Sequence, residues 1–218
     1  LYSSMAGGDL AAQVGVGKET NLGDMGPGSA ILVVASDLEE EAPLWWLRVK
    51  EAAERGAVLI VVHPRETKTE RCADYVLRSE YTREWETIQA LLEKDTEAAQ
   101  AFHEAENGLI FFGQEGLDYA SSRALAQACA NLLIETGHVG RANNGLIGVW
   151  PRGNTQGAWD MGFRPVPDLQ ETLQTAQTLY IAGADPVGDG LLDDVEEPFL
   201  VVHELFLTET ARQADVVF

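Results

Sequence analysis

The sequence predicts an α/β fold made of two doubly wound units, each built on a mainly parallel sheet. Continuous apolar runs of four to six residues, which are typical of strands buried on both faces, alternate with helical segments along the chain. Strands that alternate with helices favour βαβ units, in which the sheet is parallel. The chain has 218 residues, of which 45% are hydrophobic, so it can bury one large core or two modest ones.

The first strand-helix-strand unit follows a glycine-rich segment, residues 1–30, that we expect to be irregular. The expected elements are a strand over 30–35 (AILVVA), a helix over 43–57 and a strand over 58–62 (VLIVV). Pro43 fits the first helical turn, where its missing N–H costs nothing, and Gly56 stands where the helix should stop. The crossover should be right-handed and the two strands parallel.

The alternation of helices and strands continues to the end of the chain. The expected elements are helices over 83–94, 96–105, 119–136 and 169–176, strands over 109–112, 178–183 and 199–204, a helical turn over 208–213, and a last strand at 215–218. The first residues, LYSSMAGGDL, do not resemble a natural start, and the chain stops inside a strand. We therefore expect a longer natural polypeptide.

A glycine- and asparagine-rich stretch, NNGLIGVWPRGNTQGAWDMG (143–162), has almost no hydrophobic periodicity and brackets a single arginine, Arg152. A stretch of this kind is either a functional loop or a linker, and the residues alone leave both readings open. Because it is the longest patternless interior stretch, we place the domain boundary within it. The predicted units are residues 1–147 and 148–218.

Composition excludes several classes of function. Fifteen Lys and Arg against 35 Asp and Glu give a net charge of −20, which repels nucleic acid and anionic lipid. The chain lacks the run of about 18 apolar residues that a membrane span needs. Cys72, Cys129 and the four histidines show no metal-ligand spacing, so we expect reduced thiols, a cytoplasmic location and no protein-ligated metal.

Polar residues follow each predicted strand, at the sheet edge where ligands bind in open parallel sheets. They are Ser36 and Asp37, then residues 63–67, then Gly113 and Gln114, then residues 183–186, then His203 and Glu204. The first strand lacks the G-x-G-x-x-G pattern that a nicotinamide-dinucleotide site needs after it, and the chain lacks the Walker A pattern.

Arg65 and Arg152 have the chemistry to hold a ribose or phosphate. For Arg65 the alternative is an ion pair with a neighbouring carboxylate, which the local sequence slightly favours. Acidic residues crowd the same strand ends, at 39–41 and at 185–194, and would repel a pyrophosphate.

Aromatic side chains offer stacking surfaces, and helical spacing places Trp45 in the core with Val49 and Ala52. Trp150 and Trp159 are therefore the two tryptophans expected near a ligand. The residues contain no nucleophile paired with a base, so no catalytic residue is predicted.

Four segments resemble a known family. They are DLEEEAPLWWLRVKEAAERGAVLIVVHPRET, ANLLIETGHVGRANNGLIGVWPRGNTQGAWDMG, IAGADPV and VVHELFLTETARQADVVF. Their order and spacing resemble the molybdopterin oxidoreductase family over roughly residues 30–218. The variant is most similar to the large peripheral-arm subunit of bacterial NADH:quinone oxidoreductase, complex I. The resemblance implies domains of the type found in formate dehydrogenase and DMSO reductase.

In active members of that family, these segments hold a molybdopterin guanine dinucleotide at the strand ends. The family contacts then fall on Ser36, Asp37, His63, Arg65, Arg152, Asn154, Gln156, Gly183, Asp185, His203, Thr208 and Thr210. The family pattern has a glycine-asparagine turn in place of Ser36 and Asp37, an aspartate in place of His63, an asparagine in place of Asp185, and a glutamine-aspartate pair in place of His203 and Glu204. Acids at phosphate-facing positions imply a vestigial cofactor cleft.

The leading hypothesis is therefore a cofactor-free, non-catalytic scaffold in the large subunit of an electron-transfer oxidoreductase. It implies iron-sulfur clusters in an upstream region, the other subunits of a respiratory complex as partners, and a place at the inner face of the cell membrane without direct insertion. The alternative is the cofactor-binding part of an active molybdenum or tungsten oxidoreductase, such as a formate dehydrogenase, with bound molybdopterin guanine dinucleotide. A generic nucleotide-binding domain is the third reading, and the missing glycine pattern disfavours it.

Overall fold

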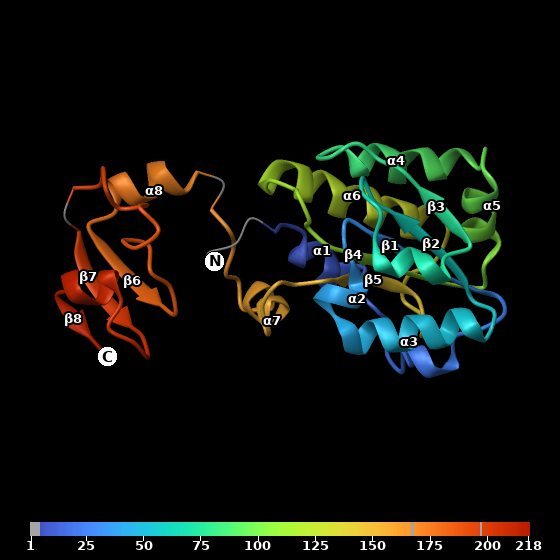
Figure 1. Ribbon diagram of the computed structural model, residues 1–218, viewed down its shortest axis with the longest axis horizontal. Helices are drawn as coiled ribbons and strands as arrows, with labels where there is room; N and C mark the ends of the chain where they lie inside the picture. Colours follow the sequence, from blue (N-terminus) through green and yellow to red (C-terminus); the bar gives the residue numbers. More distant parts are fainter. Residues whose placement is uncertain (1–4, 167, 197) are drawn as a thin grey trace. The chain divides into compact units, whose positions relative to one another are not determined.

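A computed structural model describes residues 5–166, 168–196 and 198–218 of the chain. The chain forms two compact units, Leu1–Pro165 and Val166–Phe218, each with its own parallel sheet. Figure 1 shows both units as α/β structures. The predicted fold class is therefore confirmed.

The first unit contains five parallel strands in the order β3-β2-β1-β4-β5. The strands are β1 (Ser29–Val34), β2 (Val58–Val62), β3 (Tyr75–Leu77), β4 (Asn107–Phe112) and β5 (Gly145–Gly148). All six residues of β1 are buried, because β1 is a central strand with both faces covered. The strand order reverses between β1 and β4, so the carboxyl ends of these two strands form the topological switch point.

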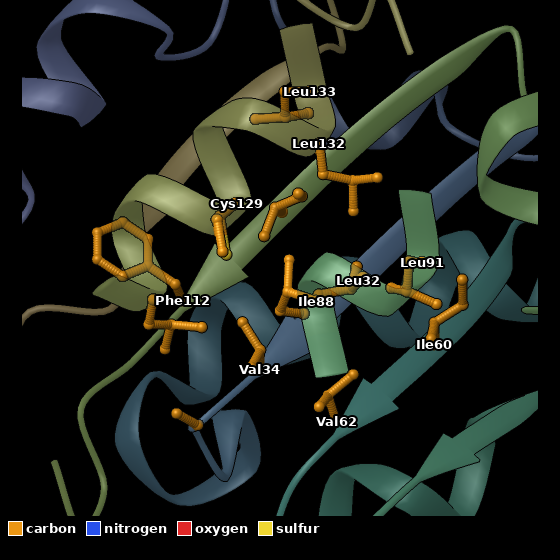
Figure 2. Close-up of a cluster of buried hydrophobic side chains, with 14 of the residues drawn as sticks. Leu32, Val34, Ile60, Val62, Ile88, Leu91, Phe112, Cys129, Leu132 and Leu133 are labelled. Carbon is orange, nitrogen blue, oxygen red and sulfur yellow. The ribbon is translucent and has the colours of Figure 1, made fainter. Parts of the chain in front are cut away.

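Helices cover both faces of this sheet (Figure 1). On one face, α3 (Pro43–Glu54) packs Trp46, Val49 and Ala52 against alternate residues of β1 and β2. The other face carries α4 (Glu84–Ala90), α5 (Glu97–Glu104) and α6 (Tyr119–Glu135). Figure 2 shows Ile88 of α4 and Cys129, Leu132 and Leu133 of α6 gathered with side chains of β1, β2 and β4. The unit is doubly wound, as predicted.

Several helix ends follow simple capping chemistry. Pro43 stands in the first turn of α3, and Thr96 and Asp118 accept backbone N–H groups at the starts of α5 and α6. After α6 the chain turns at Gly137, whose φ of 72° lies in the left-handed region where glycine is favoured. These are the boundaries that the sequence predicts, to within a few residues.

Glu84, the first residue of α4, is fully buried. Burial raises the pKa of its carboxyl; the amides of Thr82 and of Glu84 itself act in the opposite direction, although neither makes a well-formed hydrogen bond. A raised pKa in the folded state means that ionised Glu84 destabilises the fold above that pKa, and that the penalty disappears as pH falls through it.

Glu84→Gln is therefore expected to raise the free energy of unfolding at pH 7 by about 1 kcal/mol, the lower end of the cost of a poorly satisfied buried group. The gain should shrink as the pH falls. Urea unfolding at several pH values measures it, with exposed Glu93→Gln as the control. A pH-independent difference would contradict this account.

Several elements of the first unit are not predicted by the sequence. Residues 1–30 are not irregular throughout, because α1 (Gly8–Gln13) and a turn of 3₁₀ helix at Leu22–Asp24 form within them. Strands β3 and β5 are also unpredicted. Helix α2 (Leu38–Glu41) and a turn of 3₁₀ helix at Lys68–Cys72 are unpredicted too. So is α7 (Thr155–Asp160), which lies in the glycine-rich stretch. Each is short, and β5 includes two glycines, so these elements depend on tertiary contacts rather than on local preference.

The division between the units falls after Pro165, whereas the sequence places it near residue 148. The intervening residues belong to the first unit for two reasons. Strand β5 pairs with β4, with Leu109 opposite Gly145, and α7 packs on α1, where Trp159 is buried against Gly8. The stretch 143–162, which has no hydrophobic pattern in the sequence, is therefore packed into the first unit.

The second unit has three parallel strands in the order β6-β7-β8. They are β6 (Thr178–Ala182), β7 (Phe199–His203) and β8 (Val216–Val217), with helices α8 (Leu169–Thr175) and α9 (Glu209–Gln213). All five elements lie within the predicted ranges.

The second unit repeats part of the first. The motif T-x-T-x-R-x-A-D occurs at 67–74 and again at 208–215. In the first copy, Asp74 donates its N–H to the Leu59 carbonyl (2.9 Å) and accepts the Leu59 N–H (2.8 Å). In the second copy, Asp215 makes the same pair of bonds with Leu200, at 3.0 and 2.8 Å. Strands β6-β7-β8 thus correspond to β1-β2-β3.

Candidate functional site

The carboxyl ends of the strands carry the predicted site residues, and the structure sorts them into three groups. Asp37, His63 and Arg65 meet above β1, β2 and β4, where Glu115 joins them. Arg152, Asn154 and Gln156 border a cavity next to β5. The residues predicted after β6 and β7 lie at the strand ends of the second unit.

Arg65 forms a two-pronged ion pair with Glu115. Its Nε and Nη2 atoms donate to Oε1 and Oε2 of the carboxylate, at 2.5 and 2.6 Å. Its Nη1 donates to the Glu66 carbonyl (3.0 Å) and lies 3.7 Å from Oδ2 of Asp37. The hydrogen bonds from Arg65 hold the pKa of Glu115 below its usual range, and Glu115 raises that of Arg65. Of the two readings of Arg65 that the sequence left open, the structure therefore shows the ion pair with a carboxylate.

Sequence reasoning did not identify Glu115. It follows the predicted pair Gly113 and Gln114 by one residue, after β4. The sequence signal that could have identified Glu115 is its acidic side chain just after a predicted strand, β4, which pairs with β1. Only the strand order shows that it faces Arg65, because β2 and β4 flank β1.

His63 is fully buried beside this ion pair. Its Nδ1 accepts the backbone N–H of Arg65 (3.2 Å), so the neutral ring carries its proton on Nε2, which lies 3.4 Å from Oε2 of Glu115. Burial lowers the pKa of His63 more than the nearby Glu115 raises it. The ring is therefore a neutral donor directed at the same carboxylate.

Asp37 links the ends of β1 and β2 rather than facing solvent. Its carboxylate accepts the N–H of Lys68 (3.1 Å) and the hydroxyl of Thr69 (3.2 Å), while its own N–H donates to Glu41 (2.8 Å). Partial burial raises the pKa of Glu41, and the hydrogen bond that it accepts from the Asp37 N–H acts to lower it. Asp37 therefore takes part in internal polar contacts, whereas the buried hydroxyl of Ser36 has no hydrogen-bond partner among the described residues.

A cavity of about 690 Å³ opens at the carboxyl end of β5. Its volume lies in the usual range of small-molecule sites, about 300 to 1,000 Å³. The start of α3, strand β5, the loop 150–154 and the first turn of α7 provide its walls. Among the lining side chains, Leu44, Trp45, Ile147, Val149 and Trp150 are apolar, and Arg152, Asn154, Thr155 and Gln156 are polar.

The polar side of the cavity is held in place by local turns. Asn154 precedes α7 with φ 61°, and a Cβ on residue 157 would lie 2.2 Å from its Oδ1, so any side chain in place of Gly157 would displace the Asn154 amide. Gln156 donates to the Gly8 carbonyl (2.9 Å), and its Oε1 is buried without a hydrogen-bond partner in the part of the chain that is described. Arg152 is exposed and makes no ion pair with any described residue.

Two expectations about tryptophans are wrong. Trp159 does not face a ligand: it is 3% exposed and packs on α1, where a Cβ on Gly8 would fall 2.1 Å from its ring. Trp45 is not a core residue; it borders the cavity and is 37% exposed, while Trp46 takes the core position. Trp150 lines the cavity, as expected, with its ring edge-on to Phe112.

In the second unit, the predicted residues mainly bind one another. Asp185 accepts the N–H (2.8 Å) and the hydroxyl (2.6 Å) of Thr210, which lower its pKa. Thr208 caps α9, and Nδ1 of His203 lies 3.4 Å from the Tyr180 hydroxyl. Gly183 has φ 62° at the end of β6. Asp185 and Thr210 correspond to Asp37 and Thr69 of the first unit, so the repeat preserves an aspartate-threonine contact between adjacent strand ends.

Metal and membrane features can be stated only for the described residues. They contain no group of three or more His, Cys, Asp or Glu side chains placed to hold a metal ion. None of their helices has the length and apolar character needed to span a bilayer. Cys72 and Cys129 are free thiols.

Sequence comparison links the chain to oxidoreductases. A family model described as molybdopterin oxidoreductase matches residues 4–218. The F420-dependent formate dehydrogenase subunit alpha of Methanocaldococcus jannaschii is 25% identical over 95% of the chain and 43% of that relative. The F420-dependent formate dehydrogenase 2 subunit alpha of Methanococcus maripaludis is 26% identical over 93% and 42%. The chain thus spans less than half the length of these relatives.

Structural comparison supports the fold class alone. A chain of the formyltransferase/hydrolase complex FhcABCD from Methylorubrum extorquens, solved with methylofuran, superposes with a TM-score of 0.57 and 14% identity. The match covers 96% of this chain and 67% of that one.

Proposed function

The chain belongs to the molybdopterin oxidoreductase family, and from that membership we propose that it is part of the large subunit of a formate dehydrogenase. In this proposal it binds a molybdopterin guanine dinucleotide at the carboxyl ends of its strands. The relatives found are alpha subunits of formate dehydrogenases, which favours this reading over the complex I scaffold expected from the sequence. When bound, the cofactor supplies the two-electron chemistry that oxidises formate.

The observation that carries the proposal is the cavity at β5. It combines a ligand-sized volume, aromatic walls, and an arginine without an ion-pair partner among the described residues. A guanidinium binds phosphate oxygens through two parallel N–H bonds, so Arg152 suits an anionic dinucleotide. The buried, unpaired Oε1 of Gln156 is an acceptor for a donor group of a heterocycle. Trp45 and Trp150 provide apolar ring surfaces for such a ligand.

The end of β2 fits less well in this state, because Arg65 is bound to Glu115 and His63 is neutral. This observation favours a second candidate function, a cofactor-free scaffold of the complex I type. In that case Glu115 would replace the cofactor as the permanent partner of Arg65.

In both readings we propose that the chain assembles with other subunits of an electron-transfer enzyme, since the relatives are themselves named as subunits. Iron-sulfur clusters elsewhere in the protein and a cytoplasmic location remain predictions.

The deciding experiment is to measure molybdenum, tungsten, released pterin and guanine nucleotide in the protein purified with its partners from its own cells. Formate-dependent reduction of a deazaflavin or an artificial electron acceptor is measured on the same sample. Stoichiometric metal and pterin with formate oxidation are expected. Intact iron-sulfur signals without metal or pterin would contradict the proposal and support the scaffold.

A further inference from the structure

The ion pair between Arg65 and Glu115 crosses the switch point of the first sheet. Arg65 follows β2 and Glu115 follows β4, and the end of β1 lies between them. Ligands of open parallel sheets bind at this position. The pair therefore lies where a ligand would lie.

Hydrogen bonds hold the backbone of both Arg65 and Glu115 in place. The Arg65 N–H donates to His63, and its carbonyl accepts a bond from Arg78 (3.0 Å). The Glu115 N–H donates to the Ala35 carbonyl (3.0 Å). The side chains, in contrast, are partly open to water, with 38% of Arg65 and 31% of Glu115 exposed. The contact can therefore open without movement of the strands.

Glu115 uses the part of Arg65 that recognises phosphate. The Nε and Nη2 edge of a guanidinium matches two oxygens of a carboxylate or a phosphate, and here both atoms bind Glu115. Nε2 of buried His63, the proton-bearing atom, points to the same carboxylate without a well-formed hydrogen bond. When Glu115 moves away, two donors face the vacated position.

We propose that Glu115 is an internal competitor for an anion site at Arg65 and His63, so that phosphate-bearing ligands bind there only by displacing its carboxylate. The identity of the natural ligand rests on the proposed function, whereas the competition does not. Partly exposed ion pairs contribute little stability, so a phosphate with a larger charge can displace the carboxylate. Glu115 thereby sets the affinity of this sheet edge for phosphate groups.

The test uses inorganic pyrophosphate as the probe and calorimetric titration of the purified chain at pH 7.5. Glu115→Gln is expected to bind pyrophosphate about ten-fold more tightly than the unmodified chain, a difference of about 1.4 kcal/mol. The double variant Arg65→Ala with Glu115→Gln should lose this gain. Glu115→Ala should show the same gain as Glu115→Gln and replaces it if that variant does not fold.

Glu80→Gln is the matched control, since Glu80 is an exposed glutamate, paired with Arg83, on the loop after β3. Equal or weaker binding by both Glu115 variants would overturn the proposal, because a carboxylate that only positions Arg65 would help binding. An equal gain in Glu80→Gln would overturn it as well, since that would reflect net charge alone. Cofactor content does not enter this test, so its failure is distinct from failure of the proposed function.

Discussion

Under the proposed function, replacing Arg152 with alanine is expected to remove most of the bound pterin and metal from the purified protein. Arg152 lies at the cavity next to β5 and has no ion-pair partner among the described residues, so its donors are available to a phosphate. A charge-assisted pair of hydrogen bonds contributes about 1.5 to 3 kcal/mol, which corresponds to a loss in affinity of roughly ten- to a hundred-fold. Metal analysis and pterin fluorescence per chain after gel filtration measure the loss.

Two further variants separate the role of the guanidinium from a loss of charge. Arg152→Lys keeps the charge but not the planar pair of donors, so an intermediate cofactor content is expected. Arg48→Ala removes an exposed arginine of α3 that pairs with Glu51 and should keep full content. Full cofactor content in Arg152→Ala would exclude Arg152 as a cofactor contact and remove the main support for the cavity at β5.

The parts of the fold that the sequence predicts well are those in which burial dominates. Strands β1, β2 and β4 are continuous apolar runs because helices cover both faces of the sheet, and their ranges agree with the prediction to within a few residues. Strands β3 and β5 are three and four residues long, and they exist because a neighbouring strand supplies hydrogen bonds. No local pattern marks such strands.

For the candidate site, too, the sequence predicts one part and not the other. The sequence predicts that polar residues gather at the strand ends, since parallel strands end at one edge. It does not predict which of them meet, because Arg65 and Glu115 are 50 residues apart and come together only through the strand order. The two copies of T-x-T-x-R-x-A-D were a usable signal, since they place Asp74 and Asp215 in equivalent positions.

Gly113→Ala is expected to destabilise the first unit by about 3 kcal/mol. A Cβ at residue 113 would lie 2.3 Å from the Ala35 carbonyl oxygen and 2.8 Å from Cβ of Ser36, so the ends of β1 and β4 would have to separate. Ala35 already has φ 51°, a conformation that L residues seldom adopt, which leaves little room for adjustment. The expected cost is the upper end of that for overpacking, because the clashing oxygen belongs to the backbone.

Urea unfolding followed by tryptophan fluorescence measures this effect in the first unit alone, since all five tryptophans lie before residue 160. The control is Gly153→Ala, whose added Cβ would meet no atom within 4 Å, so the free energy of unfolding should change by less than about 0.5 kcal/mol. Because Glu115 donates its N–H to Ala35, separation of the strand ends should also loosen its contact with Arg65. Equal stabilities of the two variants would contradict this prediction, because they would show that the ends of β1 and β4 separate at little cost. The hydrogen bond from the Glu115 N–H to Ala35 would then not fix the position of Glu115.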